Sequence, residues 1–113
     1  VHSFDWAVLE IAERLDASLL RSALLAGPEQ YAAGSPWIGS VDPREHEDVQ
    51  AAVVALGAVV ISPHHRWCET AFVERAHAVG LGVLPWTVNE PADVARVRAA
   101  GVDGLVTDVP DEV

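Results

Sequence analysis

The stretch HAVGLGVLPWTVNEP, residues 77–91, passes from a helix-like segment through a glycine into apolar residues, and then to a tryptophan, polar residues and a proline. Glycine is favoured just after a helix, where the backbone becomes left-handed, and proline is favoured in the first turn of a helix. The same glycine signal occurs at Gly57, Gly80 and Gly101, at intervals of about 20 residues. This spacing is typical of successive βα units joined by short connections.

Apolar residues between these glycines predict both helices and strands. Helical spacing predicts apolar faces formed by Val8, Ile11, Ala12 and Leu15, by Val49, Ala52, Val53 and Leu56, by Phe72, Ala76 and Val79, and by Val94 and Val97. The predicted strands are residues 1–4, 21–26, 58–62, 81–86 and 103–108. Several of them are continuous apolar runs, which is typical of parallel strands covered on both faces. The predicted fold class is therefore α/β with a parallel sheet.

Length, charge and cysteine content exclude several classes of function. The chain has 113 residues and a formal net charge of −10, and so negative a surface repels the phosphate backbone of nucleic acids. No apolar run approaches the roughly 18 residues needed to cross a bilayer. The single cysteine, Cys68, cannot form an internal disulfide, which favours the cytoplasm. Because the sequence has no initiating methionine, we expect an internal segment of a longer protein.

In parallel α/β folds, ligands bind outside the carboxyl ends of the strands. Applied to the predicted strands, this rule selects candidate pocket residues without the help of any motif. They are Ser3, Phe4, Asp5, Trp37, Ser62, His64, His65, Trp86, Thr87, Asn89, Thr107 and Asp108. Trp37 belongs to a loop over residues 27–45 that is rich in Gly and Pro and too long for a plain connection.

Several of these candidates have simpler interpretations. Helix capping or turn formation is the commoner role for Asp5, Asn89 and Asp108. A tryptophan at the last position of a strand, such as Trp86, favours the roof of a pocket over plain core filling.

The histidines admit more than one interpretation. His64 and His65, followed by Cys68, are compatible with a zinc site, but the sequence offers no further ligands. Contact of a histidine with substrate, or an exposed pair on a loop, are the alternatives. His77 lies in the middle of a predicted helix and is interpreted as structural, and Cys68 as an inert residue near a helix start.

The segment RAHAVGLGVLPWTVNEPADVARVRAAGVDGLVTDVPDEV, residues 75–113, resembles the carboxy-terminal signature of the glycerophosphodiester phosphodiesterases. The matching elements are Ala76-His77, Gly80, residues 86–89, Pro91, residues 101–104, and Thr107-Asp108 with Pro110. SFDW, residues 3–6, is similar to the family's strand-ending Ser-Phe-Asp. The resemblance implies a TIM barrel that uses a divalent metal, magnesium or calcium, to hydrolyse a glycerophosphodiester to glycerol 3-phosphate and an alcohol.

The same resemblance implies that the chain holds strands four to eight of the barrel, with residues 1–113 as the carboxy-terminal part of the domain. The family's His-Arg, Glu-x-Asp and Glu-x-Lys motifs belong to the preceding strands. We therefore expect the catalytic and metal-binding residues outside this chain, and the isolated chain to be inactive. To cover its open edge it is expected to need the missing amino-terminal half of the barrel, or self-association.

Within this interpretation, Trp86 walls the glycerol or leaving-group side of a substrate pocket, with Phe4 as its neighbour. Asn89 and Asp108 are expected to hold loops, and Trp37 is expected to help select the alcohol.

Two alternative functions stay open. One is another phosphate-binding TIM-barrel enzyme, although the acidic end TDVPDEV lacks the glycine-rich turn that such a site needs. The other is a non-catalytic binding or assembly module on the same scaffold.

Overall fold

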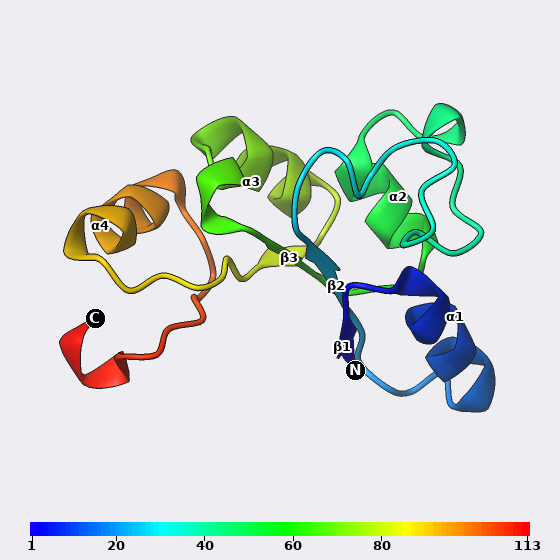
Figure 1. The fold of residues 1–113 in the computed structure, drawn as a ribbon, viewed down its shortest axis with the longest axis horizontal. Coiled ribbons are helices and arrows are strands. Elements are labelled where there is room, and N and C mark those ends of the chain that lie inside the picture. Colours follow the sequence, from blue (N-terminus) through cyan, green and yellow to red (C-terminus); the bar gives the residue numbers. More distant parts are fainter.

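The computed structural model describes residues 1–113 and shows an α/β fold with one parallel sheet. Its strands are β1 (His2–Ser3), β2 (Ser22–Leu25), β3 (Val60–Pro63) and β4 (Gly82–Val83), in the spatial order β1-β2-β3-β4. Strands that follow one another in sequence are therefore neighbours in the sheet, as short connections between βα units favour. Figure 1 shows the helices arranged around this sheet, with α1 near one end of the molecule and α4 near the other.

The pairing of β2 with β3 is the longest ladder, with Ser22–Leu25 in register with Val60–Pro63. Apolar side chains of both strands are fully buried, among them Ala23, Leu25 and Ile61. Burial on both faces of a parallel sheet explains why these strands are continuous apolar runs. The ladder also brings the carboxyl ends of the strands to one edge of the sheet.

The helices are α1 (Trp6–Leu15), α2 (Val49–Ala55), α3 (Thr70–Ala78) and α4 (Pro91–Ala100). Two of these helices have an aspartate as N-cap residue. The side chain of Asp5 accepts a hydrogen bond from the backbone of α1, and the side chain of Asp48 accepts one from the backbone of α2. α4 ends at Gly101, whose φ of 93° is left-handed, as the glycine pattern predicts. Short 3-10 helices occupy Pro43–Glu45, His65–Trp67 and Pro110–Glu112. No helix has the length and apolar character that crossing a membrane requires.

The fifth predicted strand, residues 103–108, is wrong as a regular strand. The segment instead runs irregularly beside the end of β4, where Asp103 N donates to Val83 O at 3.1 Å and Val106 N donates to Pro85 O at 2.9 Å. Because Pro85 has no backbone N–H, it cannot return a hydrogen bond and the ladder is interrupted there.

The predicted apolar face of α1 is also wrong. The side chains that α1 buries are those of Trp6, Leu9 and Ala12. The predicted face is exposed except for Ala12, with exposed fractions of 44%, 47% and 80% for Val8, Ile11 and Leu15. The indole N–H of Trp6 donates to Leu24 O at 3.1 Å, which turns the Trp6 face toward the sheet. α1 therefore carries two apolar stripes, and the second one faces outward.

The other helices bury the faces that the sequence predicts. The buried residues of these faces are Ala52, Val53, Leu56, Phe72, Ala76, Val94 and Val97. Val79, the last residue assigned to the α3 face, is an exception because it is 43% exposed at the helix end, and Val49 of the α2 face is only half-buried.

A polar pair ties α3 to the segment that follows α4. Asp103 Oδ2 lies 2.7 Å from His77 Nε2 and accepts a hydrogen bond from Val83 N at 2.8 Å. Burial raises the pKa of the Asp103 carboxyl, but these hydrogen bonds outweigh burial and leave the pKa below its ordinary value of 3.8. His77 thus links two elements by a side-chain contact far from the carboxyl ends of the strands.

We predict that Asp103→Asn lowers the free energy of unfolding by about 1 kcal/mol at pH 5, because the hydrogen bonds to the charged carboxylate are lost. A lowered pKa in the folded state stabilises the fold above pH 3.8, and this contribution disappears as the pH falls through the folded-state pKa. Urea unfolding should therefore show a difference between parent and variant that shrinks below pH 3.8. Asp111→Asn, at an exposed position, is the charge-matched control. A difference that grows in acid would contradict the assignment.

Candidate functional site

Three aromatic side chains meet at the carboxyl ends of the strands. The ring of Trp86 packs edge-on against Phe4, with ring centroids 5.4 Å apart, and against His64, with centroids 5.0 Å apart. The three residues follow β1, β3 and β4, so the parallel sheet unites positions that are far apart in the sequence. We call Phe4, His64 and Trp86 the aromatic cluster. It lies where α/β folds bind their ligands.

The ring of Trp86 is held in place by its neighbours. Its indole Nε1 donates to Ser62 O at 2.8 Å, and its backbone N donates to Pro63 O at 3.1 Å. Its carbonyl accepts a hydrogen bond from His65 N at 3.0 Å. The buried Ser62 hydroxyl donates in turn to Leu84 O. Trp86 therefore presents a fixed wall rather than a mobile side chain.

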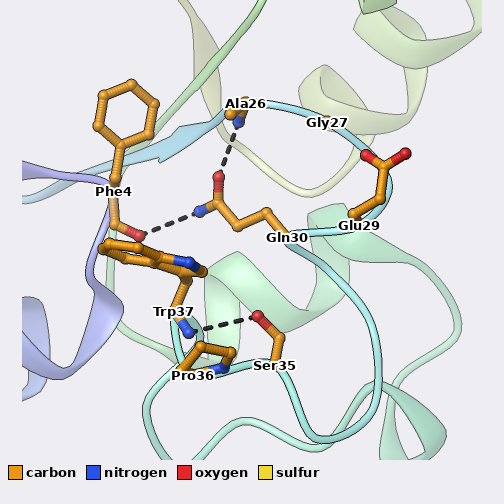
Figure 2. Close-up of a pocket in the computed structure, with 8 residues that line it drawn as sticks. All are labelled: Phe4, Ala26, Gly27, Glu29, Gln30, Ser35, Pro36 and Trp37. Atoms are coloured by element: carbon orange, nitrogen blue, oxygen red, sulfur yellow. Dashed lines mark hydrogen bonds between the residues drawn. The ribbon is translucent and has the colours of Figure 1, made fainter.

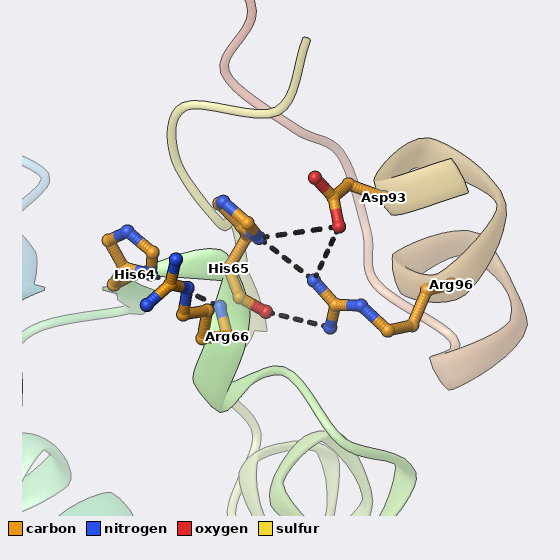
Figure 3. A network of polar contacts seen from close by, with 5 residues as sticks. All are labelled: His64, His65, Arg66, Asp93 and Arg96. Carbon is orange, nitrogen blue, oxygen red and sulfur yellow. Dashed lines mark hydrogen bonds and ion pairs between the residues drawn. The ribbon is translucent and has the colours of Figure 1, made fainter. Parts of the chain in front are cut away.

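Both histidines after β3 use Nδ1 as a hydrogen-bond acceptor (Figure 3). Arg66 N donates to His64 Nδ1 at 3.2 Å, and Arg96 Nη2 lies 2.8 Å from His65 Nδ1. Because backbone N–H and guanidinium groups can only donate, each Nδ1 is unprotonated and each neutral ring carries its hydrogen on Nε2. Burial lowers the pKa of His64, and the charges of Arg66 and Arg96 lower it further, which favours the neutral ring.

His65 is occupied by a contact with α4. Arg96 Nη1 donates to His65 O at 2.9 Å, and Arg96 Nη2 donates to Asp93 Oδ1 at 3.4 Å (Figure 3). His65 Nδ1 and Asp93 Oδ1 are 4.0 Å apart. Since Arg96 lies between them, we regard Asp93 and His65 as bridged by the guanidinium and not as a direct ion pair. His64 is thus the histidine whose ring belongs to the aromatic cluster.

A pocket of about 590 Å³ adjoins Phe4 (Figure 2). Its lining residues are Phe4, Ala26, Gly27, Glu29, Gln30, Ser35, Pro36 and Trp37. The buried amide of Gln30 builds the pocket floor, because its Oε1 accepts from Ala26 N at 2.7 Å and its Nε2 donates to Phe4 O and Leu24 O at 3.0 and 2.9 Å. One amide group therefore joins the ends of β1 and β2 to the long loop.

Hydrogen bonds of the Trp37 backbone and the burial of Ile38 hold the long loop in place. Trp37 O accepts a hydrogen bond from Trp6 N at 2.9 Å, and Trp37 N donates to Ser35 Oγ at 3.2 Å. The next residue, Ile38, is buried in the core. The Trp37 ring itself is 52% exposed and lines the pocket. The loop thus presents an aromatic surface on a backbone fixed to the fold.

The remaining predicted residues make contacts within the chain. Asn89 Oδ1 accepts from Thr107 Oγ1 at 3.0 Å and from Asp108 N at 2.9 Å, and Asn89 Nδ2 donates to Asp108 Oδ2 at 3.1 Å. These bonds join the loop after β4 to the end of the chain. The Ser3 hydroxyl bonds to the backbone of Asp5, which caps α1. Ser3 therefore shapes the end of β1.

The side chains of this chain do not fit a divalent metal. No group of three or more His, Cys, Asp or Glu residues is placed to hold a metal ion. His64 and His65 already use Nδ1. Burial raises the pKa of the Cys68 thiol to about 12, so it is not a thiolate at neutral pH. No chemical step through a metal is therefore derived from these residues.

Comparison with known proteins decides the family. The model of the glycerophosphoryl diester phosphodiesterase family matches residues 1–112. The chain belongs to this family. A crystal structure of a family protein from Silicibacter pomeroyi is 39% identical, with a TM-score of 0.81 over 97% of this chain and 34% of that one. The fold is accordingly that of part of a TIM barrel, as the resemblance implies.

Two further proteins are similar to this chain, one in fold and one over a short stretch of sequence. A phosphodiesterase of Oleispira antarctica, solved in complex with the product sn-glycerol-3-phosphate, shares the fold, with 21% identity and a TM-score of 0.71 over 98% of this chain and 38% of that one. The glycerophosphodiester phosphodiesterase of Caldanaerobacter subterraneus is 44% identical over 39 residues, which are 34% of this chain and 16% of that protein. This chain spans only about a third of the length of the solved structures that it matches.

Of the residues that line the pocket, only Phe4 and Trp37 are among the candidates from the sequence, and Gln30 and Glu29 are not. Sequence reasoning selected the long loop, but only Trp37 within it. The signal for Gln30 lies in its place soon after a strand, where an amide can reach backbone groups of two strand ends. Nothing in the sequence separates such a glutamine from an exposed one, because the distinction depends on the path of the loop.

We predict that Gln30→Ala lowers the free energy of unfolding by about 2 kcal/mol, because Ala26 N and two carbonyl groups lose their partner in a buried place. Chemical denaturation at pH 7 measures this loss. The control is Glu29→Ala, whose side chain is exposed and makes no hydrogen bond within the fold, so its stability should change by less than about 0.5 kcal/mol. Equal effects of the two substitutions would show that Gln30 does not hold the loop.

Proposed function

We propose that the protein containing this chain hydrolyses glycerophosphodiesters to glycerol 3-phosphate and an alcohol, and that the chain supplies walls of the substrate pocket. Membership of the family supports the reaction class. The observation that carries the location is the aromatic cluster, with Trp86 packed between Phe4 and His64 at the carboxyl ends of the strands. TIM-barrel enzymes carry their active sites at this edge.

In the proposed complex, Trp86 packs against the carbon atoms of the glycerol moiety and excludes water from that side. Phe4 extends the same apolar wall toward the alcohol. His64 contributes the hydrogen of Nε2, which is a donor suited to an oxygen of the diester. Because the backbone N of Arg66 and the Trp86 ring hold the His64 ring, this donor would be oriented before the substrate arrives. These residues bind and position the substrate, and none of them is assigned a bond-breaking step.

The catalytic groups are proposed to lie outside residues 1–113, which would form the carboxy-terminal part of the barrel domain. β1 has a partner on one side only, and the exposed stripe of Val8, Ile11 and Leu15 lies on the helix that follows it. A further βα unit would satisfy both surfaces. The divalent metal, magnesium or calcium, would take its ligands from that part. Self-association is the alternative way to cover the same surfaces.

The second candidate function is a non-catalytic binding or assembly module with the same pocket walls. A cytoplasmic location, inferred from the single cysteine, stays a prediction under either function.

We predict that the full-length protein releases glycerol 3-phosphate from glycerophosphodiesters in the presence of magnesium or calcium. An enzyme-coupled assay of glycerol 3-phosphate measures this turnover. The 113-residue chain alone should show none, and addition of the separately expressed remainder of the protein should restore it. A full-length protein that folds, binds the diester and shows no turnover with either metal would favour the binding module.

Trp86→Ala in the full-length protein is expected to reduce kcat/KM by about tenfold or more, because a fixed wall of the pocket is removed. Trp86→Phe keeps an apolar ring but loses the indole hydrogen bond to Ser62, so an intermediate loss is expected. Val59→Ala, at the opposite end of the β3 unit and 45% exposed, is the control. Steady-state kinetics measures kcat/KM for the three variants. If both Trp86 variants have the same kcat/KM as the parent, Trp86 does not contact the substrate.

A further inference from the structure

The side chain of Arg96 joins α4 to the loop after β3. Its Nη1 donates to His65 O at 2.9 Å, and its Nη2 lies 2.8 Å from His65 Nδ1. Figure 3 shows the guanidinium between α4 and the His65 ring, with the Asp93 carboxylate beside it. Asp93 Oδ1 accepts from Arg96 Nη2 at 3.4 Å, which directs the guanidinium toward the loop. A planar guanidinium bonded at two points fixes both the position and the orientation of the group that it binds.

His65 connects this contact with two members of the aromatic cluster. Its backbone N donates to Trp86 O at 3.0 Å. Its ring stacks on the ring of His64, with centroids 4.5 Å apart and planes inclined by 28°. His64 and Trp86 therefore both contact a residue whose backbone and ring are held by Arg96. A shift of His65 would move the two groups that the site presents after β3 and β4.

The packing of α4 does not depend on Arg96. The helix buries Val94, Val97 and Ala100 in the core. The side chain of Arg96 is 40% exposed, and contacts made by so exposed a side chain contribute little to the stability of the whole fold. Arg98 lies on the same helix and is exposed, without a side-chain contact to the loop. The contacts of Arg96 therefore act on the loop after β3 more than on the fold.

We propose that Arg96 is a positioning residue of the candidate site: it fixes the loop after β3 and, through His65, the places of His64 and Trp86. This inference rests on the proposed hydrolase function and adds to its site a residue that lies on a helix, away from the strand ends. Arg96 does not contact the substrate in this proposal and takes no part in a bond-breaking step. Its effect on the reaction is the precision with which the pocket wall and the His64 donor meet the substrate.

Hydrogen exchange of the His65 amide, which donates to Trp86 O, tests the contact without any turnover. In the full-length protein, Arg96→Ala should speed this exchange by about tenfold, because the loop loses its tie to α4 and opens more often. Arg98→Ala removes the same charge and side chain from the same helix and is the matched control, with a rate within about twofold of the parent. Unchanged exchange in Arg96→Ala, or an equal increase at every core amide, would overturn the inference.

Arg96→Lys separates geometry from charge. Lysine keeps the positive charge, but its single nitrogen cannot bridge the carbonyl and the ring of His65 as the guanidinium does. Positioning therefore requires faster exchange of the His65 amide in Arg96→Lys as well. Exchange at the rate of the parent would show that charge alone suffices, and would overturn the inference.

A double-mutant cycle tests the effect on the reaction, with the glycerophosphodiester that the full-length parent hydrolyses fastest as substrate. Arg96→Ala should lower kcat/KM about fivefold in the parent and cause a smaller loss in the Trp86→Ala background, because one of the groups that it positions is already absent. Arg98→Ala should leave kcat/KM unchanged.

The outcomes distinguish this inference from the proposed function. An active parent whose kcat/KM does not respond to Arg96→Ala, or losses for Arg96→Ala and Trp86→Ala that simply multiply, would remove Arg96 from the site and leave the hydrolase standing. Faster exchange of the His65 amide in Arg96→Ala, in a protein whose parent hydrolyses no diester, would keep Arg96 as the residue that holds the aromatic cluster and remove the hydrolase.

Discussion

The parallel pairing of β2 with β3 is the constraint on which the rest of the molecule depends. Its register sets Leu25 opposite Pro63, so the two strands end at the same level. His64 N then donates to Leu25 O at 2.8 Å, which fixes the first residue beyond the sheet. Because β1 and β4 are only two residues long, their positions follow from this central ladder. The aromatic cluster and the neighbouring pocket are built directly on its edge.

Much of the architecture could be predicted from the sequence, because it depends on local rules. Left-handed glycines, a proline at a helix start and continuous apolar runs each have a direct backbone cause. The prediction for α1 is wrong because two different helix faces both satisfy the rule of apolar periodicity. α1 has apolar residues on two faces, and the contact of the Trp6 indole with Leu24 decides which face is buried. Periodicity alone cannot rank them, since it counts apolar residues and does not see hydrogen bonds.

The candidate site could be predicted in part for a similar reason. A rule about strand ends suffices to select Phe4, His64 and Trp86, because a parallel sheet places all carboxyl ends together. The same rule selects Ser3, whose hydroxyl turns out to bond to the backbone of Asp5. It cannot select Gln30, which acts through the folding of a long loop. Topology thus indicates where a candidate site lies, and the use of each side chain depends on contacts that no pattern in the sequence encodes.

The double contact of Phe4 has a consequence for how such a protein can diverge. The Phe4 ring belongs both to the aromatic cluster and to the lining of the neighbouring pocket. A substitution of Phe4 that changes one of them therefore changes the other. Trp37 and Glu29 line only the pocket and lie on a loop outside the sheet, so their substitution does not disturb the aromatic cluster. Sequence change should therefore accumulate in that loop, while the ring after β1 stays aromatic across relatives.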